Sequence, residues 1–409
     1  MTVSLTINGQ RATAPEDSTI LEAALSAGIH IPTLCHHPDL TDVGACRICV
    51  VTVERAKGLQ TACTTPVFEG MVVHTESDEA RETRKFVLEM LLTDHPNDCM
   101  TCEVNGDCEL QDLVYDYGVS WPEHKGARHT YDIDPDPNPF VFIDRNKCVL
   151  CSRCIRACGE MQNRDVWNFA YRGFKSKLVA GADQPMLDAR CESCGQCVAY
   201  CPVGALYDKM SVGTGRLNQV QKVRTTCSYC SVGCNFDLNV RDGKVVRVTT
   251  ARDAPVNGLA TCVKGRYGYD YIHHPDRLTR PLVRARLLDS VEEKLQSGEW
   301  QVFSHLANIP LRRYGTSAGD YRHTPKGRHG GKGHGAGDGL LTPDTLIQTD
   351  WDTALDVVAR KFAAEKRAHG SQTFGVLTSA QCTNEENYLV NKFTRQVLGT
   401  NTIDHCARL

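Results

Sequence analysis

The N-terminal segment alternates between apolar and polar positions in a way that predicts a small sheet and one helix. Residues 3–14 alternate around Asn8-Gly9, a dipeptide that favours the tight turn of a β-hairpin. Thr19 and Glu22 have the spacing of a capping box, so a helix is expected to begin at this point and to end near Gly28. A hairpin followed by a helix is therefore predicted, and a loop that contains cysteines comes next.

The C-terminal part of the sequence predicts alternating helices and strands instead. A helix is expected over residues 351–366 and a short buried strand over residues 374–377. Thr383 and Glu386 form a second capping box, so another helix begins there, and residues 402–404 begin another strand. This order is typical of a β-α-β unit, in which parallel strands are joined through a helix.

Composition and charge exclude several classes of function. The chain has 409 residues, of which 41% are hydrophobic, and a formal net charge of -3. A charge so close to zero gives no support to nucleic-acid binding or to a membrane-surface role. No apolar run approaches the ~18 residues of a membrane helix, and residues 1–17 contain no apolar signal segment, so we expect a cytoplasmic protein without a membrane span. The unusual feature is cysteine, with 21 residues.

The cysteines occur in tight groups, which favours metal clusters over disulfide bonds. A disulfide scaffold suits small secreted chains, and four-thiolate zinc sites use C-x2-C pairs. Three cysteines spaced two residues apart and followed by a fourth are instead the signature of bacterial [4Fe-4S] ferredoxins. The signature occurs at Cys148, Cys151, Cys154 and Cys158 and again at Cys191, Cys194, Cys197 and Cys201. Because the fourth cysteine of each run binds the other cluster in such ferredoxins, Cys201 should complete the first set and Cys158 the second.

A different spacing marks the N-terminal group, which consists of Cys35, Cys46, Cys49 and Cys63. The plant-type ferredoxin spacing is C-x4-C-x2-C followed by a distant cysteine, and this group differs in its longer first loop. Together with the predicted hairpin and helix, it indicates a ferredoxin-like β-grasp domain with a [2Fe-2S] cluster. His36 and His37 raise the alternative of Rieske-type ligation, but four cysteines are present, so solvated loop histidines are expected.

Two further groups complete the set. One consists of His95, Cys99, Cys102 and Cys108. Because it offers only three thiolates, His95 is the candidate fourth ligand of a [4Fe-4S] cluster, and a neutral imidazole would raise the potential of that cluster. The other consists of Cys227, Cys230, Cys234 and Cys262, with a hairpin expected at residues 239–248. One [2Fe-2S] and four [4Fe-4S] clusters indicate an electron-transfer protein, and only Cys382 and Cys406 remain outside the groups.

The order of these motifs resembles three related groups of proteins. They are the large iron–sulfur subunit of respiratory NADH:quinone oxidoreductase, the iron-only hydrogenases and the alpha subunit of NAD(P)-linked formate dehydrogenases. The sequences C-S-Y-C-S-V-G-C from Cys227 and C-V-K-G-R-Y-G from Cys262 are similar to the cluster domain that opens a molybdopterin oxidoreductase. Residues 375–388 and 401–409 resemble formate dehydrogenase.

The resemblance implies an oxidoreductase, the alpha subunit of a molybdenum- or tungsten-dependent formate dehydrogenase. Formate would be oxidised to CO2 at a bis-molybdopterin guanine dinucleotide site, and the clusters would carry electrons to a partner subunit with flavin and NAD(P). Lys264 would lie between the last cubane cluster and the pterin as an electron relay. The alternative is a non-catalytic wiring subunit of an NADH:quinone oxidoreductase-like complex. An iron-only hydrogenase is disfavoured, because no cysteine motif for its active cluster follows.

The chain departs from the family pattern in two places. Residues 285–345 are longer than is usual and contain a Gly- and His-rich run, which predicts a flexible insertion. Within it, His323, His329 and His334 raise the alternative of a stray metal site. The sequence also ends at Leu409, directly before the selenocysteine or cysteine that binds the metal in the resembling enzymes. We therefore expect no catalytic residue among these residues, a selenocysteine codon after Leu409 and no formate oxidation by this chain alone.

The expected fold class is a multidomain α+β iron–sulfur protein that ends in the start of an α/β molybdopterin oxidoreductase domain. The expected domains are a [2Fe-2S] β-grasp ferredoxin domain (1–78), a [4Fe-4S] domain with one histidine and three cysteine ligands (79–120), a double [4Fe-4S] ferredoxin domain (138–210), a [4Fe-4S] domain of the molybdopterin oxidoreductase type (220–284), the flexible insertion (285–345) and the start of a molybdopterin-binding α/β domain (346–409).

Overall fold

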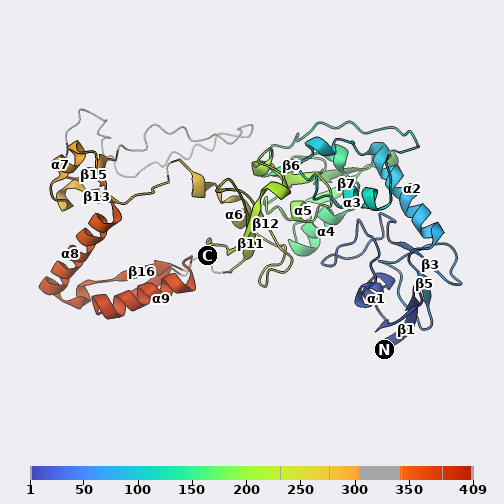
Figure 1. The fold of residues 1–409 in the computed structure, drawn as a ribbon, viewed down its shortest axis with the longest axis horizontal. Coiled ribbons are helices and arrows are strands. Elements are labelled where there is room, and N and C mark those ends of the chain that lie inside the picture. Colours follow the sequence, from blue (N-terminus) through green and yellow to red (C-terminus); the bar gives the residue numbers. More distant parts are fainter. Residues whose placement is uncertain are drawn as a thin grey trace. The chain divides into compact units, whose positions relative to one another are not determined.

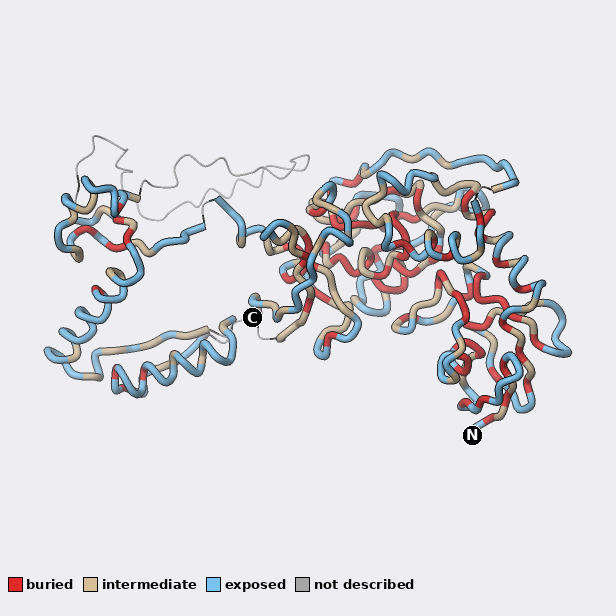
Figure 2. The backbone as a smooth tube through the Cα atoms, viewed as in Figure 1, coloured by how far each residue is buried: buried red, intermediate tan, exposed pale blue. Residues whose placement is uncertain are grey.

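The fold is taken from a computed structural model (Figure 1). It describes residues 2–120, 122–230, 232–275, 277–303, 341, 343–379 and 381–406. The chain divides into two compact units, of which the first contains Met1–Thr226 and Cys234–Tyr269 and the second contains Cys227–Gly233 and Asp270–Leu409. Most of the buried residues belong to the first unit (Figure 2).

A five-stranded sheet opens the first unit, with the strand order β2-β1-β5-β3-β4. Its strands are β1 (Thr2–Ile7), β2 (Gln10–Pro15), β3 (Val50–Val53), β4 (Gln60–Thr61) and β5 (Val72–His74). β1 and β2 form an antiparallel hairpin, and β5 pairs in parallel with β1. The turn residues Asn8 and Gly9 have φ of 52° and 82°, the left-handed conformation that a type I′ turn requires. The predicted hairpin is therefore confirmed.

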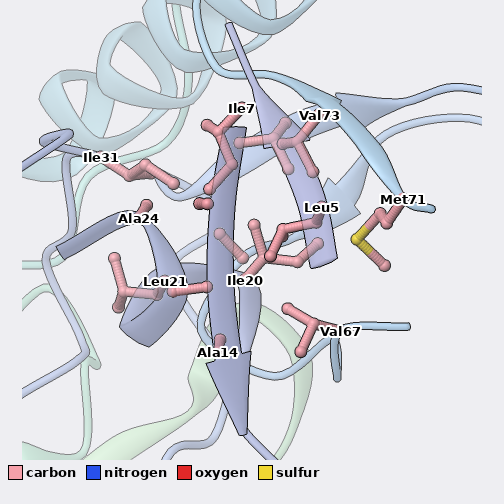
Figure 3. Packing of buried hydrophobic residues seen from close by; sticks show 14 of the residues in the cluster. Leu5, Ile7, Ala14, Ile20, Leu21, Ala24, Ile31, Val67, Met71 and Val73 are labelled. Carbon is pink, nitrogen blue, oxygen red and sulfur yellow. The ribbon is translucent and has the colours of Figure 1, made fainter. Parts of the chain in front are cut away.

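Helix α1 (Ile20–Ser26) begins at the predicted capping box. The Thr19 hydroxyl accepts a hydrogen bond from the Glu22 backbone N–H, and the Glu22 carboxylate accepts one from the Thr19 N–H at 2.7 Å. Ile7 of β1 and Ile20 of the helix are both fully buried in the core between the sheet and α1 (Figure 3). The apolar residues of β1 alternate with less buried polar ones, because successive strand residues point to opposite faces.

Two helices, α2 (Asp78–Asp94) and α3 (Glu109–Asp116), follow the sheet. The Ser77 side chain accepts a hydrogen bond from a backbone N–H in the first turn of α2, and His95 is the C-terminal cap of the same helix. Cys108 is the residue directly before α3. The second predicted ligand group therefore lies in the connection between the two helices.

The double ferredoxin region consists of two similar halves. Its elements are β6 (Val141–Ile143), α4 (Arg153–Arg156), β7 (Trp167–Ala170), β8 (Lys177–Ala180), α5 (Gln196–Ala199) and β9 (Leu206–Asp208). β6 pairs antiparallel with β9, and β7 pairs antiparallel with β8. Each half thus has the order strand, cysteine loop, short helix and strand, as expected from the repeated cysteine signature.

A three-stranded antiparallel sheet and a short helix complete the first unit. They are β10 (Gln221–Thr226), β11 (Asn235–Arg241), β12 (Lys244–Thr249) and α6 (Val263–Tyr267). The turn between β11 and β12 is formed by Asp242 and Gly243, with φ of 50° and 74°. This confirms the hairpin predicted in this part of the chain.

The second unit begins with a small sheet and a short helix. These are β13 (Leu282–Arg284), α7 (Val291–Gln296), β14 (Gln301–Val302) and β15 (Leu346–Gln348), with the strand order β13-β15-β14. Ala285, Trp300 and Ile347 form a buried apolar cluster, which explains why residues 285–303 fold although they were expected in a flexible insertion. The candidate histidines His323, His329 and His334 lie outside the described residues.

Alternating helices and strands follow: α8 (Trp351–His369), β16 (Val376–Ser379), α9 (Asn384–Lys392) and β17 (Ile403–Cys406). β16 and β17 pair in parallel, and the capping box at Thr383 and Glu386 is present, so the predicted β-α-β unit is confirmed. The expectation that the first strand is buried was wrong, because Leu377 is 85% exposed. Two strands and one helix are too few to enclose it. Of the described helices, none combines the length and apolar character that crossing a membrane requires.

A buried arginine joins the β-grasp sheet to α2 and α3. Arg84 is 0% exposed, and its Nη2 donates to the carbonyl oxygens of Val50 and Thr75, both at 2.7 Å. Its Nη1 donates to the Glu76 carboxylate at 2.8 Å and to the Tyr117 hydroxyl at 2.9 Å. This side chain of α2 thus bonds to β3, to the residue directly after β5 and to the residue directly after α3.

Replacing this arginine is expected to destabilise the N-terminal part of the first unit. Arg84→Met leaves two buried carbonyl oxygens without a donor, and the free energy of unfolding should fall by about 3 kcal/mol. Arg81→Met is the matched control, since Arg81 is exposed and contacts the same carboxylate at 2.7 Å, and its loss should cost less than about 1 kcal/mol. Urea unfolding followed by circular dichroism measures both, and equal midpoints for the two variants would contradict the assignment.

Candidate iron–sulfur centres

The N-terminal group is assembled by the loop after α1 and by the residues that follow β4. Cys35, Cys49 and Cys63 are buried, and the Sγ atoms of Cys49 and Cys63 are 3.4 Å apart. The Cys46 backbone N–H donates to the Cys35 Sγ at 3.4 Å, and the Ile48 N–H donates to the Cys46 Sγ at 3.5 Å. The structure therefore brings the four predicted thiols together and directs backbone donors at sulfur, which is how proteins tune cluster potentials.

The thiols of this group are set up for metal binding. Sulfur–sulfur hydrogen bonds lower the pKa of Cys46 to about 6 and that of Cys49 to about 7, and they raise the pKa of their partners Cys35 and Cys63. Thiolate is the form that binds metal, so the lowered pKa values make Cys46 and Cys49 easier to ionise than ordinary thiols. The donor set fits a [2Fe-2S] cluster, and this ligand set stays a prediction.

The two histidines beside this group are held by the loop. His36 Nδ1 lies 2.6 Å from the Asp42 carboxylate, and the Asp39 backbone N–H donates to His37 Nδ1 at 3.2 Å. The His37 ring packs 4.5 Å from the Tyr200 ring, and burial lowers the pKa of His37 to about 4. The expectation of solvated histidines was therefore wrong, because both side chains are at most 15% exposed and hydrogen-bonded.

The second group lies between α2 and α3. Burial, with smaller contributions from the charges of Cys102 and Cys99, raises the pKa of Cys108 to about 11. The Nδ1 atom of His95 is buried without a hydrogen-bond partner, and burial lowers the pKa of the ring, which keeps it neutral. An unsatisfied buried nitrogen costs about 1–3 kcal/mol unless something binds it. A neutral imidazole in the same connection as three thiols fits a [4Fe-4S] cluster with His95 as the fourth ligand, and this ligand set stays a prediction.

Sequence reasoning missed two residues that lie against this group. A Cβ atom on Gly204 would come within 2.7 Å of the Cys102 Sγ, so only glycine allows this approach. Lys147 is buried, with its Nζ 3.3 Å from Asp98 and 3.4 Å from Asp144. Burial lowers the pKa of Lys147, but Cys102 and the two carboxylates outweigh it and the net shift is upward, so the ammonium stays charged. The only available signal was position, since Lys147 directly precedes the first ferredoxin cysteine.

The two ferredoxin cysteine loops have the same backbone conformation. Leu150 and Ser152 in the first loop have φ of 51° and 60°, and Ser193 and Gly195 at the equivalent positions have φ of 54° and 71°. In each loop a backbone N–H donates to the sulfur two residues before it, as Ser193 does to Cys191 at 3.3 Å. Two loops with the same backbone conformation and the same hydrogen bonds to sulfur are suited to bind two clusters of the same type.

The structure pairs the cysteines across the two loops. One cavity is lined by Cys148, Cys151, Cys154 and Cys201, together with apolar side chains of the same region. Around the other set, the charge of Cys158 is among those that raise the pKa of Cys191, Cys194 and Cys197. Cys201 therefore lies with the cysteines of the first run and Cys158 with those of the second, as the crossed arrangement requires.

Burial of these cysteines disfavours their ionisation to thiolates in the absence of bound metal. Burial raises the pKa of Cys148 and Cys151 to about 12, and that of Cys154 well above its usual range. Iron would replace the thiol protons and neutralise the thiolates, so its binding is coupled to folding. In the described part of the chain, no three or more His, Cys, Asp or Glu side chains converge on a point suited to a single metal ion. A cubane cluster is larger than one ion and requires its thiolates farther apart.

The last predicted group is divided between the two units. Cys227 and Cys230 belong to the second unit, and Cys234 and Cys262 to the first. The Cys227 group therefore stays a prediction. Lys264, the expected electron relay, is an exposed residue in α6, two positions after Cys262. That role also stays a prediction.

Family comparisons match successive parts of the chain. The matched families are a 2Fe-2S iron-sulfur cluster binding domain (residues 1–78), the NADH-ubiquinone oxidoreductase-G iron-sulfur binding region (84–122), the ferredoxin-like domain of NADH-quinone oxidoreductase subunit 3 (138–207), the Fe4S4 domain of molybdopterin oxidoreductases (220–274) and molybdopterin oxidoreductase (277–409). The chain thus combines parts similar to the iron–sulfur domains of NADH-quinone oxidoreductases with a part similar to molybdopterin oxidoreductases. The expected multidomain fold class is thereby confirmed.

Curated relatives extend well beyond this sequence. The alpha subunit of an NADPH-Fe(3+) oxidoreductase from Geobacter sulfurreducens is 31% identical over 100% of this chain and 40% of its own length. A Staphylococcus aureus protein named provisionally as a formate dehydrogenase is 26% identical over 99% of this chain and 39% of its own length. The chain thus spans about two fifths of the relatives it matches. A crystal structure of an NAD+-reducing [NiFe]-hydrogenase is 32% identical and covers 53% of this chain and 91% of its own, with a TM-score of 0.48.

Crossed ligation has a direct test. Cys201→Ala should damage the cluster of Cys148, Cys151 and Cys154, although Cys201 belongs to the second run. Cys158→Ala should damage the cluster of Cys191, Cys194 and Cys197. Each variant should lose about four of the irons in the anaerobically reconstituted chain and one [4Fe-4S] signal in electron paramagnetic resonance. If each substitution instead damaged the cluster of its own run, the crossed arrangement would be excluded.

The contact at Gly204 also predicts a local effect. Gly204→Ala forces a methyl group against the Cys102 sulfur, so the signal of the His95 group should broaden or disappear, with a destabilisation of roughly 1–3 kcal/mol. Gly126→Ala is the control, because a Cβ atom there meets only Thr93 at an ordinary 3.5 Å. The measurements are the iron content and the electron paramagnetic resonance spectrum of each variant. An unchanged spectrum for Gly204→Ala would refute the close approach of Gly204 to the Cys102 sulfur.

Proposed function

We propose that the chain is the electron-transfer portion of a formate dehydrogenase alpha subunit. The iron–sulfur clusters bound by its thiolates carry electrons between a molybdenum or tungsten bis-pterin site, where formate is oxidised to CO2, and a partner subunit with flavin and NAD(P). The observation that carries the proposal is the succession of buried thiol groups in the first unit, joined to a match with molybdopterin oxidoreductases over residues 277–409. The formate-dehydrogenase name of one relative supports the choice of substrate.

The cofactors assigned by this proposal are one [2Fe-2S] cluster, four [4Fe-4S] clusters and the pterin. The iron–sulfur clusters supply one-electron redox chemistry, and the protein supplies position, burial and hydrogen bonds to sulfur. The first four groups fit this role, since their cysteines are buried or half-buried except for Cys99, which is exposed. No described residue is assigned to the molybdenum or tungsten.

A second candidate function is supported by the relative from Geobacter sulfurreducens, whose name is NADPH-Fe(3+) oxidoreductase subunit alpha. In that case electrons would come from NADPH and leave to Fe(III), and formate would play no part. The cluster-bearing residues would have the same role in both functions, so the substrate assay distinguishes the two.

The test uses the protein purified anaerobically from its host together with the subunits that remain bound. Formate should reduce the cluster signals and drive reduction of NAD+ or NADP+. Cys262→Ala should abolish nucleotide reduction by formate, because it removes a ligand of the group next to the pterin, whereas Cys382→Ala lies outside every group and should have no effect. Reduction of Fe(III) by NADPH, with no response to formate, would establish the second candidate instead.

A further inference from the structure

Arg156 connects the N-terminal cysteine loop to the first ferredoxin loop. It is the last residue of α4, and it is 7% exposed. Its Nη2 donates to the Cys35 carbonyl oxygen at 2.5 Å and to the Cys151 carbonyl oxygen at 3.3 Å. One guanidinium nitrogen is therefore shared between a candidate ligand of the [2Fe-2S] cluster and a candidate ligand of a [4Fe-4S] cluster.

The remaining donors of this guanidinium also have neutral acceptors. Nη1 donates to the Thr41 carbonyl oxygen at 2.6 Å, and Nε donates to the Ser152 hydroxyl at 3.3 Å. Arg153, one turn earlier, is different, because it forms a bidentate ion pair with the Glu109 carboxylate at 2.6 and 2.7 Å. Among the residues that the structure describes, no carboxylate forms such an ion pair with Arg156.

A buried cation without a counter-charge costs several kcal/mol, so buried charges in proteins are normally paired. The groups on either side of Arg156 supply the missing charge when they hold clusters. A cluster bound by four thiolates carries net negative charge, and reduction adds to it. The geometry therefore points to the two clusters as the counter-ions of Arg156.

We propose that Arg156 is a positioning residue that holds these two loops together and favours the reduced state on both sides of it. The proposal rests on the proposed function, because it needs both clusters in place. A positive charge between two redox centres makes the addition of an electron to either of them more favourable. Loss of the charge should therefore shift both midpoint potentials to more negative values.

The loop that contains Cys35 has other attachments to the same region, so it does not depend on Arg156 alone. The Thr41 backbone N–H donates to the Glu160 carboxylate at 2.8 Å, and Leu40 packs in a buried cluster with Ala157 and Tyr200. Asp39 accepts hydrogen bonds from Arg252 at 3.1 and 3.2 Å. Substitution of Arg156 thus leaves contacts that keep the loop attached and folded, while it removes the bridge between Cys35 and Cys151.

The experiment is a redox titration of the anaerobically reconstituted full chain, followed by electron paramagnetic resonance. Arg156→Gln should shift the [2Fe-2S] potential and one [4Fe-4S] potential in the negative direction and leave the other cluster potentials unchanged. Arg164→Gln is the matched control, because Arg164 is an exposed residue of the same segment that pairs with Glu192, and its loss should shift none. If Arg156→Gln shifted neither the [2Fe-2S] potential nor any [4Fe-4S] potential, the proposal would be overturned.

Arg156→Lys separates the effect of the positive charge from that of the hydrogen-bond geometry. It also provides a test if Arg156→Gln binds less iron than the wild type. A lysine keeps the positive charge but has no planar fork to bridge Cys35, Thr41 and Cys151. The two potentials should stay near those of the wild type, while the magnetic interaction between the two reduced clusters should weaken. Unchanged interaction in this variant, or shifted potentials equal to those of Arg156→Gln, would overturn the proposal. Failure of the cluster assignment is recognised separately, since the wild-type chain would then bind no clusters. Failure of the formate assignment alone would leave the clusters and the shifts in their potentials in place.

Discussion

Burial of basic side chains among backbone carbonyl groups is the interaction on which the first unit depends. The loops that carry the cysteines have little regular structure, so they cannot hold one another through sheet or helix contacts. Arg84 joins the β-grasp sheet to two helices, and Arg156 joins the Cys35 loop to the Cys151 loop. Each buried guanidinium has several donors with fixed directions, so a single side chain can set the relative positions of segments that are distant in sequence.

These hydrogen bonds from buried arginines help to hold the thiol groups close to one another around shared apolar side chains. One buried cluster in the first unit includes or contacts Cys46, Cys108, Cys148 and Cys201, which come from three different predicted ligand groups. The charge of Cys35 also contributes to the raised pKa of Cys151. The ferredoxin region therefore lies against both the N-terminal group and the His95 group. Such proximity suits an electron-transfer protein, because electrons pass between neighbouring centres without any movement of the chain.

The second unit has a different physical character. Most of α8 and α9 is exposed (Figure 2). The exposed residues include large apolar side chains such as Trp351 and Tyr388. The parallel pair β16 and β17 has Leu377 on an open face. Parallel sheets are normally covered on both faces, so these elements alone do not form a closed core. These elements lie within residues 277–409, which match the molybdopterin oxidoreductase family, whereas the buried cores lie mostly in the first unit.

Local patterns in the sequence determined the elements and the candidate ligands. The turn at Asn8 and Gly9, the capping boxes and the spacing of cysteines act over a few residues, and short-range chemistry decides them. The repeated cysteine signature also predicted that Cys201 completes the first ferredoxin set, and the cavity that these cysteines share agrees with it. Only the tertiary structure revealed that Arg156 donates a hydrogen bond to a carbonyl oxygen 121 residues away. It also corrected the solvated state expected for His36 and His37 and the burial expected for residue 377. Those properties depend on which distant segments meet, and no local spacing encodes such contacts.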